Sequence, residues 1–147
     1  MVYNAILGGS VNSKMFQNVR EKESLAYTAR SLYIKHKAIL LITAGIEMQK
    51  FEKALEVIKI QEEDMKKGNF TDEDIVNAKI FLTNLYKSYT DDASAMVDLS
   101  FGQYLLNMKF DVDEIIEKIN NVNKEDIINI ANKMKLKVNY FLGNKGE

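Results

Sequence analysis

Residues 13–31 read SKMFQNVREKESLAYTARS, and the hydrophobic period changes inside this stretch. In its first half, Met15, Phe16 and Val19 recur at the spacing of one helix face. From Ala26 onward the pattern becomes that of a strand, in which apolar residues are mixed with threonine, arginine and serine. The stretch therefore predicts a helix that gives way to a strand, with one face of the strand partly in contact with water.

The flanking sequence predicts a second strand and an earlier helix. Residues 35–37 form a Lys-His-Lys turn, and residues 38–46 are nearly all apolar, as expected for a central strand covered on both faces. Residues 2–7 are a short apolar segment followed by Gly8 and Gly9, the pattern of a last helical turn closed by a left-handed glycine. Because so short a helix is marginal, we expect the domain to be amino-truncated, with its first strands missing before this chain.

The rest of the sequence is helical until residues 137–142, where alternation predicts a closing strand. The apolar residues Phe51, Leu55, Ile58 and Met65 recur on one helix face, and Gly68 after them predicts that this helix ends there. Three helix starts carry a capping box together with flanking apolar residues that can pack as a staple. These are Thr71 and Asp74 with Phe70 and Ile75, Asp111 and Glu114 with Phe110 and Ile115, and Asn123 and Asp126 with Val122 and Ile127.

The predicted order is a helix stub, a helix, two strands, about five helices and a strand. Because strands and helices do not alternate as in a doubly wound fold, the predicted class is α+β. We expect a mixed or antiparallel sheet covered by helices. The length suits one domain over residues 1–147.

Composition excludes several kinds of function. Twenty basic residues face twenty-one acidic ones, so there is no excess of positive charge for nucleic acid. There is no cysteine, and the single histidine, His36, lies between two lysines, so a tetrahedral zinc site or a catalytic triad within the chain is not expected. The longest apolar run is too short to cross a membrane. No signal peptide is recognisable at the amino end, which favours the cytoplasm.

Arg20 and Tyr27 are the candidate site residues. The chain has eighteen lysines but only two arginines, Arg20 and Arg30, and both fall in residues 13–31. A helix end and the start of the next strand can direct two side chains into one space, where a guanidinium offers a planar fork of donors and a phenol can donate to an oxyanion. The alternative is that Arg20 only covers Phe16 and that Tyr27 is a half-buried strand residue.

Three segments together resemble the carboxyl-side domains of the insulinase/pitrilysin family of zinc metallopeptidases. They are residues 6–10 (ILGGS), 13–22 (SKMFQNVREK) and 24–27 (SLAY). The resemblance implies one half of a clamshell that closes around a peptide. In such proteins the other half carries an inverted zinc motif, His-x-x-Glu-His.

The resemblance also implies roles for individual residues. Arg20 would hold backbone carbonyls of the substrate and help to place Tyr27, which would hydrogen-bond the scissile carbonyl as it becomes tetrahedral. Gly8, Gly9 and Phe16 would be further substrate contacts. No His-x-x-Glu-His occurs in this chain, so it would hold no metal. The partners would be a zinc-binding half and a peptide, and the chain would not cleave peptides alone.

Two alternatives remain open at this point. The chain could be a non-catalytic subunit or scaffold of the same fold, as in respiratory-complex core proteins and the glycine-rich subunits of processing peptidases. It could instead be an unrelated helical interaction module, with a partner groove formed by Val97, Phe101, Tyr104 and Leu105.

Overall fold

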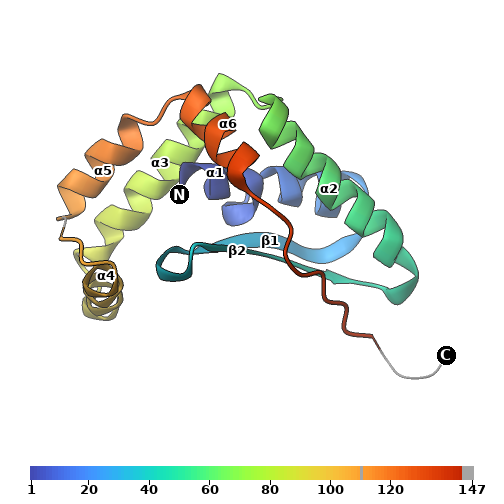
Figure 1. Cartoon of the computed structure of the whole chain (residues 1–147), viewed down its shortest axis with the longest axis horizontal. Coiled ribbons are helices and arrows are strands. Elements are labelled where there is room, and N and C mark those ends of the chain that lie inside the picture. Colours follow the sequence, from blue (N-terminus) through green and yellow to red (C-terminus); the bar gives the residue numbers. More distant parts are fainter. Residues whose placement is uncertain (110, 144–147) are drawn as a thin grey trace.

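The computed structural model describes residues 1–109 and 111–143 (Figure 1). The amino-terminal part consists of α1 (Val2–Asn4), the π-helices η1 (Ala5–Gly9) and η2 (Met15–Lys22), β1 (Ala26–Ile34), the 3₁₀ turn η3 (Lys35–Lys37) and β2 (Ile39–Ile46). The rest consists of the 3₁₀ turn η4 (Met48–Lys50), α2 (Phe51–Lys67), α3 (Asp72–Tyr89), α4 (Ala93–Leu105), α5 (Val112–Asn120) and α6 (Lys124–Lys133). The fold is α+β, as predicted.

A two-stranded antiparallel sheet lies under a layer of helices. β1 pairs with β2 through partners such as Arg30 with Thr43 and Leu32 with Leu41. In Figure 1 the helices other than α4 lie on one side of this sheet, with α1 and the segments that follow it between the sheet and the longer helices, and α4 lies beyond the turn that joins the two strands. The largest fully buried side chains come from both the early segments and the later helices, and they are Leu7, Met15, Val19, Met65, Ile119 and Ile127. This shared core fixes η1 and η2 relative to α2, α5 and α6.

The helix boundaries follow the sequence closely. Thr71 accepts a hydrogen bond from the amide of Asp74 at 3.1 Å, and the Asp74 carboxylate accepts from the Thr71 amide at 2.8 Å. The capping boxes at the starts of α5 and α6 form through the same pair of hydrogen bonds. Gly68 ends α2 with φ of 74°. These predictions are confirmed, except that the staple residue Phe110 lies outside the described residues.

The predicted closure of the first helix by a left-handed glycine is wrong. Gly68 is the one glycine with positive φ among the described residues, and η1 ends at Gly9 without it. Gly8 is required for a different reason. A Cβ atom at Gly8 would lie 2.6 Å from the backbone nitrogen of Ser31 and 2.7 Å from its hydroxyl oxygen. The glycine therefore allows η1 to lie directly against β1.

Two strand predictions are also wrong. β2 is not covered on both faces, because burial alternates along it and Leu41 remains 47% exposed. Residues 137–142 form neither a strand nor a helix, and Tyr140 is 78% exposed. A strand needs a neighbour to satisfy its backbone donors and acceptors, and the sheet in the described part of the chain has two strands only.

Candidate functional site at the helix-to-strand junction

Arg20 and Tyr27 line the same open hollow, of about 470 Å³, at the junction between η2 and β1. We call this site the junction hollow. Arg20 comes from the last turn of η2 and Tyr27 from the start of β1, and both side chains are exposed. The other lining residues are Glu21, Ser24, Leu25, Ala26, Glu47 and Lys50. The two candidates suggested by the sequence are therefore neighbours on one surface.

An unusual backbone turns the chain sharply between the two side chains. η2 has π-helical geometry, and at its end the Leu25 amide donates to the Val19 carbonyl at 3.0 Å. Ser24 adopts a left-handed conformation, with φ of 50°. π-Helical segments are rare and occur frequently at functional sites, and positive φ is uncommon for a residue other than glycine. The helix thus ends abruptly, and β1 begins within reach of Arg20.

A β-bulge determines the direction of Tyr27. Ala26 is paired with Ile46, but Thr28 is paired with Gly45, so Tyr27 is the extra residue on β1. Regular alternation would place Tyr27 on the same face as the buried Ala29. Instead Tyr27 is 71% exposed, as is typical of bulges that redirect side chains. The bulge therefore keeps the phenol out of the core.

Phe16 supports the Arg20 guanidinium. The centre of the guanidinium lies 4.6 Å from the centroid of the Phe16 ring, at cation–π distance. The nearest carboxylate contact is loose, since Arg20 Nε lies 3.6 Å from Glu21 Oε1. Arg20 does cover Phe16, as the simpler alternative expected, and it also forms a wall of the junction hollow.

Tyr27 shares an acceptor with Lys50. The Tyr27 hydroxyl donates to Glu47 Oε1 at 3.3 Å, and Lys50 Nζ donates to the same oxygen at 3.0 Å. The hydrogen bond and the charge of Lys50 hold the pKa of Glu47 below its ordinary value. Sequence reasoning missed Glu47 and Lys50. A signal was present, because pairing the start of the first strand with the end of the second brings residue 47 beside Tyr27.

The structure does not bring Gly8 and Gly9 to the junction hollow. Gly8 lies against Ser31, and a Cβ atom at Gly9 would lie 2.6 Å from the side-chain nitrogen of Asn4. Neither glycine is among the residues that line the hollow. Their close contacts account for the glycines through packing, and their part in substrate binding stays a prediction.

Comparison with known proteins identifies the family of this chain. Residues 1–82 match the family model described as the peptidase M16 inactive domain. The chain belongs to the peptidase M16 family. The insulinase-type resemblance is thereby confirmed, and the idea of an unrelated helical module is wrong. The apolar α4 side chains on which that idea rested are exposed, and nothing in the structure shows what covers them.

Several relatives match almost the whole of this M16 domain. A probable inactive metalloprotease, YmfF of Bacillus subtilis, is 37% identical over 141 residues, which are 96% of this chain and 33% of the relative. An uncharacterised zinc protease of the same organism, YmxG, is 29% identical over 137 residues, 91% of this chain and 34% of the relative. The chain thus spans about a third of the length of these relatives.

Solved structures agree with this assignment. A conserved protein from Enterococcus faecalis V583 has a TM-score of 0.82 and 31% identity, over 90% of this chain and 31% of that one. A protease from Helicobacter pylori has a TM-score of 0.70 over 90% of this chain and 32% of its own, and at 20% identity it supports the fold alone.

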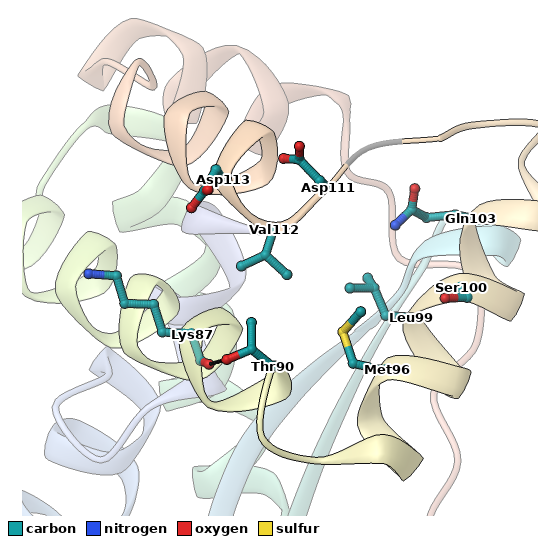
Figure 2. A pocket seen from close by; sticks show the side chains of 9 residues that line it. All are labelled: Lys87, Thr90, Met96, Leu99, Ser100, Gln103, Asp111, Val112 and Asp113. Atoms are coloured by element: carbon teal, nitrogen blue, oxygen red, sulfur yellow. Dashed lines mark hydrogen bonds between the residues drawn. The ribbon is translucent and has the colours of Figure 1, made fainter.

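A second hollow in the M16 domain, of about 390 Å³, lies between α3, α4 and α5 (Figure 2). Its polar side chains include Thr90, which donates to the Lys87 carbonyl at 2.7 Å, and Asp111, which accepts from the Glu114 amide at 2.8 Å. Met96, Leu99 and Val112 supply its apolar lining. Because Thr90 and Asp111 are engaged at helix ends, this hollow offers no arrangement comparable to Arg20 and Tyr27.

The donor groups of this domain do not fit a zinc site. Over residues 1–109 and 111–143, no group of three or more His, Asp or Glu side chains is placed to hold a metal ion. His36 lies exposed in η3, between two lysines. Among the helices that the structure describes, none combines the length and apolar character needed to cross a membrane.

Proposed function

We propose that this domain is the metal-free half of an M16 zinc endopeptidase, and that it binds peptide and stabilises the tetrahedral intermediate through Arg20 and Tyr27. The observation that supports the proposal is their common position in the junction hollow, where a bulge and a π-helix expose both side chains. The catalytic zinc and its general base would belong to the other half, in the same chain or in a partner subunit.

Tyr27 would donate a hydrogen bond to the scissile carbonyl as charge develops on its oxygen. The phenol already donates to an exposed oxygen, Glu47 Oε1, so it is directed toward solvent and a substrate oxygen can replace that acceptor. Donors aimed at a developing oxyanion act mainly on the transition state. The phenol would thus act on the chemical step more than on initial binding.

Arg20 would bind backbone carbonyls of the peptide beside the scissile bond. Contact with the Phe16 ring holds the guanidinium at the surface, where its planar fork of N–H groups could donate to two carbonyls. The loose contact with Glu21 can be given up at little cost, because exposed ion pairs contribute about 0–1 kcal/mol. Phe16 then acts on the substrate indirectly, by supporting Arg20.

A second candidate is a non-catalytic subunit of the same fold. It is favoured by the name of one relative, which is called a probable inactive metalloprotease. In that case the junction hollow would have no reacting bond to stabilise.

The deciding experiment is Tyr27→Phe in the complete protein, assembled with its zinc-binding half. We expect kcat to fall about 10²–10³-fold with little change in KM. Tyr140→Phe is the matched control, because Tyr140 is equally exposed but lies outside the junction hollow. Equal turnover in Tyr27→Phe and the parent would remove Tyr27 from the mechanism. Absence of metal-dependent cleavage in every variant would favour the non-catalytic subunit.

A further inference from the structure

The sheet has an outer face that none of the described helices covers. Its side chains alternate with the buried ones of β1 and are exposed. On β1 they are Thr28, Arg30 and Leu32, and on β2 Ile39, Leu41 and Thr43. We call this set the outer sheet face. In Figure 1, α1, α2, α3, α5 and α6 lie on the opposite side of the sheet, and α4 lies beyond the turn at one end of the two strands.

The outer sheet face combines an apolar patch with one unmatched cation. Leu32 is paired with Leu41 across the strands, and the two are 57% and 47% exposed. Arg30 is paired with Thr43, and neither strand contains an acidic residue. Within the described residues, Arg30 takes part in none of the ion pairs between side chains. An exposed patch of this composition fits a ligand with apolar and negatively charged groups.

The outer sheet face continues from the junction hollow. Thr28 follows Tyr27 at the bulge, and Arg30 lies two residues further along β1. At the rise of an extended strand, Tyr27 and Arg30 are separated by about 10 Å along the chain direction. An extended peptide that presented one bond to Tyr27 would therefore pass Arg30 about three residues away.

We infer that the outer sheet face selects peptides by an acidic side chain, which Arg30 binds, and by a neighbouring apolar side chain, which the Leu32–Leu41 pair receives. This inference rests on the proposed function and adds a substrate class to it. Charge complementarity favours a peptide over a second copy of the chain. A twofold contact centred on this face would bring Arg30 near its own symmetry mate, with no carboxylate from either strand between them.

The test uses the complete protein with its zinc-binding half and a set of fluorogenic peptides. The peptides differ only in Glu, Gln or Lys, placed three residues from the cleaved bond on either side. We expect kcat/KM to be about tenfold higher for the best Glu peptide than for its Lys counterpart, because attraction to Arg30 is replaced by repulsion. Arg30→Gln should remove this preference and Arg30→Glu should reverse it.

Lys37→Glu is the control for net charge. Lys37 is exposed in η3, at the far end of the strands from Tyr27, so the same change of charge there should leave the Glu preference intact. An unchanged preference in Arg30→Glu would overturn the inference. So would a change of sedimentation coefficient in Arg30→Glu with the peptide preference unaltered, which would identify the face as a contact between copies.

A binding measurement separates this inference from the proposed function. Fluorescence anisotropy of labelled Glu and Lys peptides is measured on the complete protein after chelation of its metal. Tighter binding of the Glu peptide that is lost in Arg30→Gln would support the inference even if no peptide is cleaved. Cleavage without any charge preference would leave the proposed function standing and overturn the inference.

Discussion

The Tyr27 hydroxyl donates a 3.3 Å hydrogen bond to Glu47 Oε1, the same oxygen that accepts from Lys50. The two partners are twenty residues apart in the sequence, and strand pairing of Ala26 with Ile46 brings them together. Under the proposed function, Glu47 would position the phenol until a substrate oxygen replaces it as the acceptor.

Replacement of Glu47 should affect turnover less than replacement of Tyr27. Glu47→Ala removes the acceptor that orients the phenol before substrate binds. We expect kcat to fall about two- to tenfold, which corresponds to the free energy of one ordinary hydrogen bond. Glu47→Gln retains an acceptor oxygen and should restore most of the activity. Steady-state kinetics of the complete protein measure both. A Gln variant as impaired as the Ala variant would argue against positioning through this hydrogen bond.

Arg20→Lys should lower kcat/KM by about 10–100-fold, because an ammonium keeps the charge but loses the planar fork that contacts two carbonyls. Phe16→Leu should reproduce part of this loss, since it removes the ring under the guanidinium. Kinetics on a peptide series, with thermal unfolding as the check on folding, measure the effect. Full activity in Arg20→Lys would mean that charge alone is sufficient at this position.

Gly8→Ala should destabilise the domain by roughly 1–3 kcal/mol, the usual cost of overpacking a core. The new methyl group would meet the Ser31 backbone at 2.6 Å, so η1 or β1 would have to move. Gly102→Ala is the matched control, because Gly102 lies inside α4 and a methyl group added there would have no neighbour within 4 Å. That change should stabilise the helix by about 0.5–1 kcal/mol. Urea unfolding of both variants is the measurement, and equal effects would contradict the packing role of Gly8.

Glu62→Gln should stabilise the domain near neutral pH. Burial raises the pKa of Glu62 above its ordinary value of 4.5, so the folded state holds the proton more tightly than the unfolded state. The ionised carboxylate therefore lowers the free energy of unfolding above the folded pKa, and this penalty disappears below the unfolded pKa. The melting temperature of Glu62→Gln should exceed that of the parent at neutral pH and equal it well below pH 4.5. A difference independent of pH would refute this origin.

Local sequence signals predicted the helix boundaries and the location of the candidate site. The capping pairs of Thr71 with Asp74 and Asn123 with Asp126 act within one turn, so a short stretch of sequence is sufficient. In residues 26–34, apolar residues mixed with Thr28, Arg30 and Ser31 were sufficient to predict β1. Spacing singled out Arg20 and Tyr27 but left the simpler alternative open, and only the family resemblance implied roles for them. The structure shows that both line the junction hollow.

Features that depend on contacts distant in sequence were not predicted. The bulge at Tyr27 is defined only by the pairing of β1 with β2, and the role of Gly8 only by its contact with Ser31. The apolar composition of β2 indicated a covered strand, but composition does not reveal whether a covering layer is present. Residues 137–142 carry a strand pattern, but the part of the chain that the structure describes provides no strand for them to pair with.

The bulge at Tyr27 also affects which residues of β1 can change during evolution. In a regular strand, Tyr27 would point to the same face as Ala29, which is buried. Only a shift of the strand register by one residue would then bring the phenol to the outside, and it would turn Ala29 outward as well. The extra residue removes this constraint, since Tyr27 and Thr28 are both exposed while Ala29 and Ser31 are buried. Mutations that repack the interior under β1 can thus accumulate without rotating the phenol, and new recognition residues can arise on the outside without disturbing the core.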